Sequence, residues 1–156
     1  MAIANQEMIR DNNRRQVLEY IVNNPPVSRA ALAKELHLTK ATISNIVQDL
    51  MEQNLVAEIG SAQTALGRKP ILLEFQKKCG YAFSIDVHPR QIITLISDLK
   101  GEDCHLKEYP FQEEDCLLEL LRSIIKETLP RCQNAPYGIV GISIGIYGVV
   151  RENEII

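Results

Sequence analysis

The sequence lacks tryptophan, holds few aromatic residues and contains no long apolar run. A membrane-spanning helix needs about 20 consecutive apolar residues, and the most apolar stretch, Tyr137–Val150, is interrupted by four glycines. The opening segment, Met1–Arg15, is polar and has no apolar core of a secretory signal. These absences predict a cytoplasmic protein with no membrane partner. The length of 156 residues fits one domain or two small ones.

Cysteine is scarce and widely spaced. The four cysteines, Cys79, Cys104, Cys116 and Cys132, are separated by 25, 12 and 16 positions. No pair has the C-x₂₋₄-C spacing of a zinc site or a redox motif. Thiols in a reducing compartment stay free, so we expect neither a disulfide nor a metal site.

Histidine is also sparse, and no catalytic arrangement accompanies it. His37, His88 and His105 lie far apart, without a serine, cysteine or carboxylate at the spacing of a known catalytic motif. Asp86 is the one acidic residue at a predicted strand end that a catalytic role would suit, and we interpret it as a strand-end or turn residue. We therefore assign no catalytic residue and no cofactor, and we expect that the chain is not an enzyme.

The charge is unevenly distributed along the chain. The net charge is −3. Residues 1–70 hold eight lysines and arginines against seven acidic residues, a net charge of +1, whereas residues 71–156 hold nine against thirteen, a net charge of −4. The acidity thus belongs to the second half, and a basic surface in the first half is compatible with the overall charge.

The first half has the pattern of three helices followed by a hairpin. Apolar residues recur at helical spacing, most clearly at Ile43, Ile46, Val47 and Leu50. Ser28 and Thr39 stand where N-caps are expected. The predicted elements are helices over Arg10–Asn23, Arg29–Leu36 and Lys40–Gln53 and strands over Val56–Ile59 and Pro70–Phe75. This order predicts a winged helix-turn-helix domain over residues 1–75.

The second half has a strand pattern interrupted by one amphipathic helix. Gln76–Gly80 is interpreted as the domain boundary. The predicted elements are strands over Tyr81–Val87, Gln91–Asp98 and His105–Tyr109, a helix over Asp115–Thr128 and a strand over Ile139–Ile146. This order predicts part of an α/β domain over residues 80–156, so that the fold class of the whole chain is mixed α/β.

The third helix has the composition of a DNA-reading helix. Opposite its apolar stripe lie Ala41, Ser44, Asn45 and Gln48, with Lys40 and Thr42 at the edges of that face. Asparagine and glutamine can bond adenine with two hydrogen bonds, and a small alanine can contact a thymine methyl group. Any solvated helix face is also polar. The absence of acidic residues from Thr39 to Gln48 favours DNA.

The return between the two hairpin strands is a second basic feature. Gly67-Arg68-Lys69-Pro70 presents two cations between a flexible and a stiff residue. An arginine held in this way can enter a narrow minor groove or bind flanking phosphates; an ordinary charged hairpin return has the same composition. The full set of predicted DNA-binding residues is Ser28, Arg29, Thr39, Lys40, Ala41, Thr42, Ser44, Asn45, Gln48, Arg68 and Lys69.

These motifs together resemble a known family. The matching segments are Ser28–Ser44, Glu58-Ile59-Gly60, Gly67-Arg68-Lys69-Pro70, Lys78–Val87, Asp98–Gly101 and Pro136–Ile142. They resemble the ROK family (repressors, open reading frames and kinases), and within it most of all the xylose-operon repressors. The resemblance implies a dimeric bacterial repressor whose winged helix binds a palindromic operator. It also implies that residues 80–156 are the first part of an actin-like ATPase (ribonuclease-H-like) domain that senses a sugar.

The sequence departs from the family pattern in three ways. Where the kinases have an Asp-x-Gly-Gly-Thr phosphate loop, Asp86 is followed by Val87-His88-Pro89-Arg90, so we expect no ATP binding. Tyr147 stands where proline is usual. The chain ends at Ile156, before the segments that in the family hold the catalytic aspartate, the zinc site and most sugar-binding residues.

The expected partners are double-stranded DNA with a palindromic operator, a second copy of the chain, and a sugar effector if the complete sensing domain is present. Two alternatives remain open from the sequence. The winged helix can serve as a protein-interaction module, since the first half is only weakly basic. The second half can be the remnant of a sugar kinase.

Overall fold

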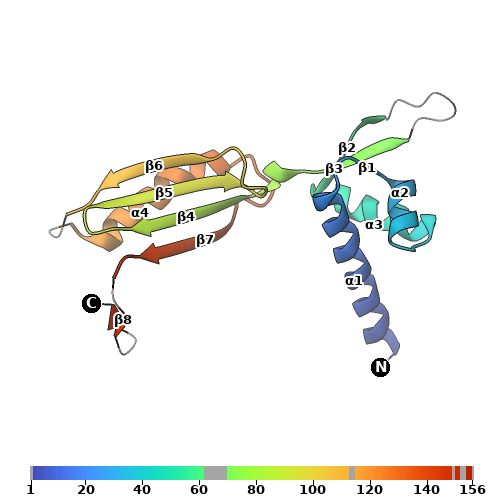
Figure 1. Cartoon of the computed structure of the whole chain (residues 1–156), viewed down its shortest axis with the longest axis horizontal. Coiled ribbons are helices and arrows are strands. Elements are labelled where there is room, and N and C mark those ends of the chain that lie inside the picture. The colour runs from blue at the N-terminus through green and yellow to red at the C-terminus, as the bar shows by residue number, and fades with distance from the viewer. Residues whose placement is uncertain (1, 62–69, 113–114, 149, 152–153, 156) are drawn as a thin grey trace. The chain divides into compact units, whose positions relative to one another are not determined.

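The computed structural model describes residues 2–61, 70–112, 115–148, 150–151 and 154–155. The chain divides into two compact units, Met1–Gln76 and Lys77–Ile156, each of which is described by itself. Figure 1 shows the helices of the first unit and the main sheet of the second.

The first unit contains three helices and a small antiparallel sheet. Its elements are α1 (Ala2–Asn23), β1 (Val27–Ser28), α2 (Arg29–Glu35), α3 (Lys40–Glu52), β2 (Val56–Ser61) and β3 (Ile71–Phe75). The strand order is β1-β3-β2, with both pairs antiparallel. This is the architecture of a winged helix-turn-helix domain, as the sequence predicts.

The core of the first unit forms where α3 packs against α1, α2 and the sheet. Ile43, Val47 and Leu50 of α3 are fully buried, because their spacing brings them onto one face of the helix. The other buried members of this core are Val17, Ile21, Val27, Leu32, Ile46, Val56 and Leu73. The core therefore fixes which face of α3 is turned inward.

Two elements differ from the sequence-based expectation. Helix α1 begins at Ala2 rather than Arg10; residues 6–12 are all exposed, including Met8 and Ile9. Strand β1 is two residues long and was not predicted. It forms because Val27 and Ser28 pair with Leu73 and Leu72 of β3, a partner more than 40 positions away.

Strand β2 also runs further than expected, to Ser61. Its pairing with β3 shifts between Glu58 and Gly60, so that one extra residue lies in β2. Gly60 adopts φ = +121° at this bulge, a backbone conformation that favours glycine. The bulge twists the strand pair at the base of the wing.

The second unit is a four-stranded mixed sheet with one helix packed on it. Its elements are η1 (Lys77–Cys79), β4 (Tyr81–Val87), β5 (Gln91–Asp98), β6 (His105–Pro110), α4 (Leu117–Thr128), η2 (Leu129–Cys132), β7 (Ile139–Ile146), β8 (Val150–Arg151) and β9 (Glu154–Ile155). The strand order is β6-β5-β4-β7, and only the β4–β7 pair is parallel. Strands β8 and β9 form a separate antiparallel pair.

Alternation along the strands places the second core beneath α4. Phe83, Ile85 and Val87 alternate with exposed residues along β4 and are buried with Ile92 and with Ile124 of α4. Strand β7 lies at the end of the sheet order. Its residues Ile142, Ile144 and Ile146 are about half exposed, at 47%, 52% and 50%.

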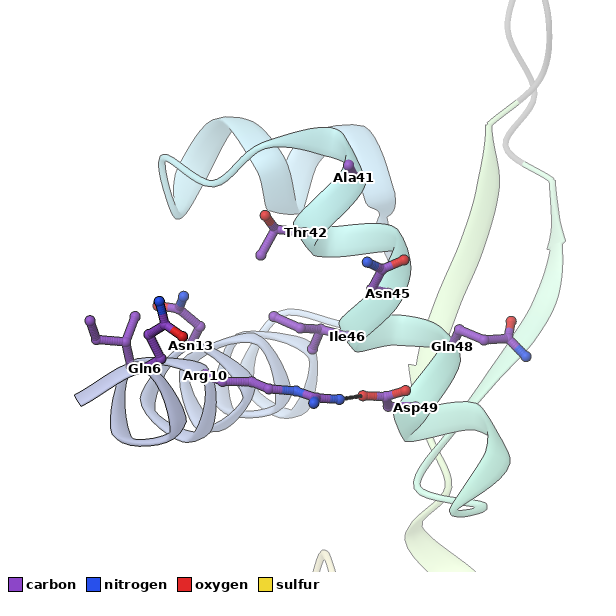
Figure 2. Close-up of a pocket in the computed structure, with 10 residues that line it drawn as sticks. Gln6, Arg10, Asn13, Ala41, Thr42, Asn45, Ile46, Gln48 and Asp49 are labelled. Atoms are coloured by element: carbon purple, nitrogen blue, oxygen red, sulfur yellow. Dashed lines mark hydrogen bonds and ion pairs between the residues drawn. The ribbon is translucent and has the colours of Figure 1, made fainter. Parts of the chain in front are cut away.

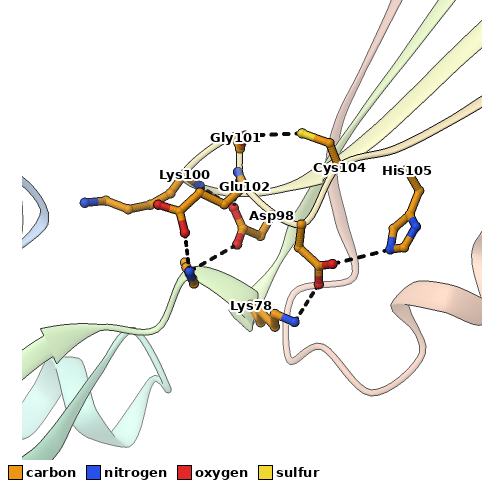
Figure 3. Close-up of polar contacts among 9 residues, drawn as sticks. Lys78, Asp98, Lys100, Gly101, Glu102, Cys104 and His105 are labelled. Atoms are coloured by element: carbon orange, nitrogen blue, oxygen red, sulfur yellow. Dashed lines mark hydrogen bonds and ion pairs between the residues drawn. The ribbon is translucent and has the colours of Figure 1, made fainter.

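Charged side chains fix the start of the second unit to the turn between β5 and β6 (Figure 3). Lys77 of η1 pairs with Glu102, and Lys78 pairs with Asp103. The buried carboxylate of Asp98 accepts hydrogen bonds from the backbone N–H groups of Lys100 and Glu102 at 3.0 and 2.8 Å. The connecting segment is thus held as part of the second unit.

The four cysteines are free and differ in exposure, which predicts their reactivity. Cys79 and Cys132 are buried, and burial raises the pKa of each thiol above its ordinary value. Cys104 and Cys116 are exposed. Because the thiolate is the reacting form, we expect a limiting amount of iodoacetamide to label Cys104 and Cys116 first in the folded protein. Mass spectrometry of the labelled peptides checks this, and labelling of all four at one rate would contradict it.

The Lys78–Asp103 pair predicts a dependence of stability on pH. The hydrogen bond and the charge of Lys78 hold the pKa of Asp103 below its ordinary value. The pair therefore stabilises the fold above about pH 4 and loses this effect as the pH falls and the carboxylate is protonated. The variant Asp103→Asn suits the test, because asparagine tolerates the positive φ of 49° at this position.

We expect Asp103→Asn to lower the melting temperature slightly at pH 7. The difference should shrink as the pH falls through the lowered pKa of Asp103, so that it is smaller at about pH 2 than at pH 7. Thermal unfolding at the two pH values measures the difference. A difference of equal size at both would show that the charge of Asp103 has no part in it.

Candidate nucleic-acid interface

Helices α2 and α3 form a compact helix-turn-helix. After Leu36 the chain turns sharply, with His37 at φ = +54° and the Leu38 N–H donating to the carbonyl oxygen of Ala33 at 3.2 Å. Thr39 then precedes the first turn of α3. This tight turn at His37 and Leu38 sets the direction in which α3 leaves α2.

Both predicted N-caps are present. The Ser28 hydroxyl accepts the backbone N–H of Ala31 at 3.2 Å. The Thr39 hydroxyl accepts the backbone N–H of Thr42 at 3.1 Å, and the two threonine hydroxyls lie 2.8 Å apart. These bonds satisfy N–H groups that the first turn of a helix leaves without an internal partner. Ser28, Thr39 and Thr42 therefore have a structural role whether or not they contact DNA.

The outward face of α3 is the centre of the candidate interface. The side chains exposed on it are Lys40, Ala41, Ser44, Asn45 and Gln48, and Thr42 is half-buried. Figure 2 shows Ala41, Asn45 and Gln48 following one another along the helix. The structure thus brings together all the predicted base-reading residues on one continuous surface.

Two predicted residues are engaged by carboxylates. The Gln48 amide nitrogen donates to Glu52 Oε1 at 3.0 Å. The Arg29 guanidinium is ion-paired with Glu58 of β2 at 2.8 Å, and a second nitrogen lies 3.6 Å from Met51 Sδ. Neither partner was predicted from the sequence. Glu52 lies one helical turn after Gln48, so the sequence spacing indicates that contact. Arg29 and Glu58 are far apart in the sequence, and only the fold brings them together.

The wing is described at its base. Strands β2 and β3 pair from Val56 with Phe75 to Ser61 with Ile71. The two predicted wing cations, Arg68 and Lys69, lie outside the described residues. Their contact with DNA stays a prediction from the sequence.

A groove between α1 and α3 is a feature that the sequence analysis missed. It has a volume of about 590 Å³, and residues of both helices line it, including Gln6, Arg10 and Asn13 of α1. Arg10 reaches across to Asp49 of α3, with a nitrogen-to-oxygen distance of 2.9 Å (Figure 2). Because α1 was expected to begin at Arg10, no sequence pattern indicated a wall on this side of α3.

In the second unit, the end of β4 departs from a phosphate-binding loop. Asp86 Oδ2 lies 2.9 Å from His88 Nε2, and the His88 ring stacks on Tyr147 with centroids 6.1 Å apart. A Cβ atom added to Gly145 would lie 2.9 Å from Asp86 Oδ1, so a side chain there would require the Asp86 carboxylate to shift. Asp86, His88 and Tyr147 thus contact one another at the end of β4.

In the part of the chain that the structure describes, no group of three or more histidine, cysteine, aspartate or glutamate side chains is arranged to hold a metal ion. Among the same residues, no helix is long and apolar enough to cross a membrane.

Comparisons with known proteins agree with the geometry of both units. The MarR family model matches residues 12–65. The chain is 36% identical to the xylose repressor of Bacillus spizizenii over 160 residues, and 34% identical to that of Bacillus subtilis over 157 residues. Each alignment covers 99% of this chain and 41% of the relative. The chain thus spans about two-fifths of the length of these relatives.

A crystal structure of a ROK family transcriptional regulator, a homologue of the E. coli MLC protein, has a TM-score of 0.63 against this chain at 24% identity. The match covers 91% of this chain and 37% of that one. The predicted fold class is therefore confirmed: mixed α/β, with an N-terminal winged helix-turn-helix followed by a second unit whose fold is similar to the corresponding part of that regulator. The resemblance to ROK repressors, and among them to xylose repressors, is confirmed as well.

Thr39 offers a test of how the candidate interface is built. Thr39→Ala removes the cap of α3, and we expect a loss of about 1 kcal/mol in the free energy of unfolding. Thr39→Ser keeps the accepting hydroxyl and serves as the matched control. Urea unfolding followed by circular dichroism measures both variants. Equal stability of Thr39→Ala and the unsubstituted protein would show that the cap contributes nothing.

Proposed function

We propose that this chain is the DNA-binding portion of a sequence-specific transcriptional repressor, with the beginning of its sugar-sensing domain attached. Residues 1–75 bind DNA and residues 80–156 belong to the sensing domain. The observation that carries the proposal is the outward face of α3, which is exposed, built of small and amide side chains, and without an acidic residue from Thr39 to Gln48. The similarity to proteins named xylose repressors supports it.

In this proposal α3 enters the major groove with its N-terminal end first. Asn45 and Gln48 bond the edges of adenines, and Ala41 contacts a thymine methyl group. Lys40 and Thr42 contact phosphates, which position the helix without reading sequence. Gln48 exchanges its hydrogen bond with Glu52 for a bond to a base, so its readout costs one intramolecular contact.

The other predicted residues lie around this helix. Ser44 reaches base edges. Ser28 and Thr39 cap the two helices and face the DNA backbone. Arg29, which is ion-paired with Glu58, also contacts the DNA backbone. Arg68 and Lys69 of the wing bind the flanking phosphates or minor groove.

The proposed partners follow from the same reasoning. A palindromic operator with half-sites about one helical turn apart binds a homodimer. The relatives are named for xylose, so a sugar, with xylose as the first to test, relieves repression. The protein is a regulator and not an enzyme, since its relatives are named repressors and a histidine and a proline follow Asp86. It acts in the cytoplasm, where the DNA is.

The test is selection of DNA from fragmented genomic DNA by the purified chain at about 0.15 M salt, followed by sequencing. A shared palindrome is the expected result. For six or more phosphate contacts, binding to it should weaken by roughly 10³-fold or more between 50 and 200 mM salt. Retention that is independent of sequence, both for the chain and for an artificially dimerised form, would overturn the proposal and favour a protein-interaction module.

Substitution of the base-reading residues gives a sharper prediction. Asn45→Ala and Gln48→Ala each remove a bond to a base edge, so we expect a loss of roughly 1–3 kcal/mol on the selected site and little loss on unrelated DNA. Binding of each variant to both DNAs, at one salt concentration, measures the ratio. Lys34→Ala, an exposed change on α2 away from this face, is the control. An unchanged ratio would show that α3 does not read these bases.

A further inference from the structure

The groove between α1 and α3 opens beside the proposed base-reading face. Its α3 wall includes Ala41, Thr42, Asn45 and Gln48, which belong to that face. Its other wall is the early part of α1, where Gln6 and Asn13 project toward α3 (Figure 2). A helix seated in the major groove has a DNA backbone strand along each side. The groove therefore lies where one of these strands passes.

The chemistry of the groove suits a phosphate backbone. Its polar lining residues are Gln6, Arg10, Asn13, Thr42, Asn45, Gln48 and Asp49. All of these except Asp49 carry a hydrogen-bond donor, and amide, hydroxyl and guanidinium donors are those that contact DNA phosphates. The first turn of α3 also lines the groove, so the positive end of its helix dipole faces the same space.

Arg10 supplies a positive charge to the lining of this groove. Its side chain is 73% exposed, and the ion pair with Asp49 joins one of its terminal nitrogens to one carboxylate oxygen. An arginine has five N–H donors in a fork, so this pair leaves the guanidinium able to bond a phosphate as well. Asp49, 35% exposed, lies beneath it on α3. The carboxylate thus compensates part of the charge while holding the guanidinium across the groove.

We propose that the α1–α3 groove receives one backbone strand of the operator, and that Arg10, held by Asp49, binds a phosphate there. The inference rests on the proposed function. It adds Arg10 of α1 to the predicted DNA interface, whose other residues belong to α2, α3, their N-caps and the wing. It also gives the exposed residues 6–12 of α1 a role that the core of the first unit does not require.

The experiment compares the full chain with Arg10→Ala on the DNA selected by the unsubstituted protein. We expect several-fold weaker binding at about 0.15 M salt. We also expect the slope of log affinity against log salt to become shallower by about 0.9, the value for one phosphate contact. The ratio of affinities for the selected and unrelated DNA should stay unchanged, because a phosphate contact carries no sequence information.

Arg15→Ala is the matched control, since Arg15 is exposed on the same helix and does not line the groove. It removes the same charge and should leave the salt slope closer to that of the unsubstituted chain. Thermal unfolding checks that both variants fold; an exposed ion pair contributes little to stability. If Arg10→Ala binds with the affinity and slope of the unsubstituted chain, the inference fails while the proposed function stands. Failure of the unsubstituted chain to select any site would instead remove the proposed function.

Discussion

Burial of one side of α3 determines which side chains this helix exposes on the surface of the first unit. Ile43, Val47 and Leu50 are fully buried, and each such side chain contributes about 1.5–3 kcal/mol relative to an exposed position. A helix is rigid at this length, so fixing its apolar side also fixes the opposite side to within a few degrees of rotation. The surface proposed to contact DNA is therefore a product of the core. The two hydroxyl caps, Ser28 and Thr39, fix where the helices that carry this surface begin.

A second constraint is the compensation of charge around this surface. Arg10 pairs with Asp49, and Arg29 pairs with Glu58. Each contact holds a long side chain close to the protein before any partner arrives, which lowers the conformational entropy lost on binding. In the proposed function, the same ion pairs also reduce the long-range attraction of the first unit for DNA. A surface of this kind favours discrimination among sites over indiscriminate binding.

Periodic elements could be predicted closely from the sequence, and contacts between distant segments could not. The strands Tyr81–Val87, Gln91–Asp98 and Ile139–Ile146 have the predicted bounds, because alternation or a continuous apolar run marks each of them. Residues 6–12 of α1 are exposed and carry no apolar stripe that is buried, and β1 exists only through its pairing with β3. For the candidate site, the polar face of α3 was predictable from its helical spacing. The wall that α1 forms beside it depends on the packing of two helices.

The edge of the main sheet has a consequence for handling the chain by itself. No strand in the described part of the second unit pairs with the outer side of β7, and Ile142, Ile144 and Ile146 remain half exposed there. An edge strand with apolar side chains is a template for intermolecular pairing. We therefore expect molecules of this chain to self-associate through β7 as the protein concentration rises. Light scattering should therefore accompany any titration of DNA with the chain, so that self-association through β7 is not mistaken for cooperative binding to DNA.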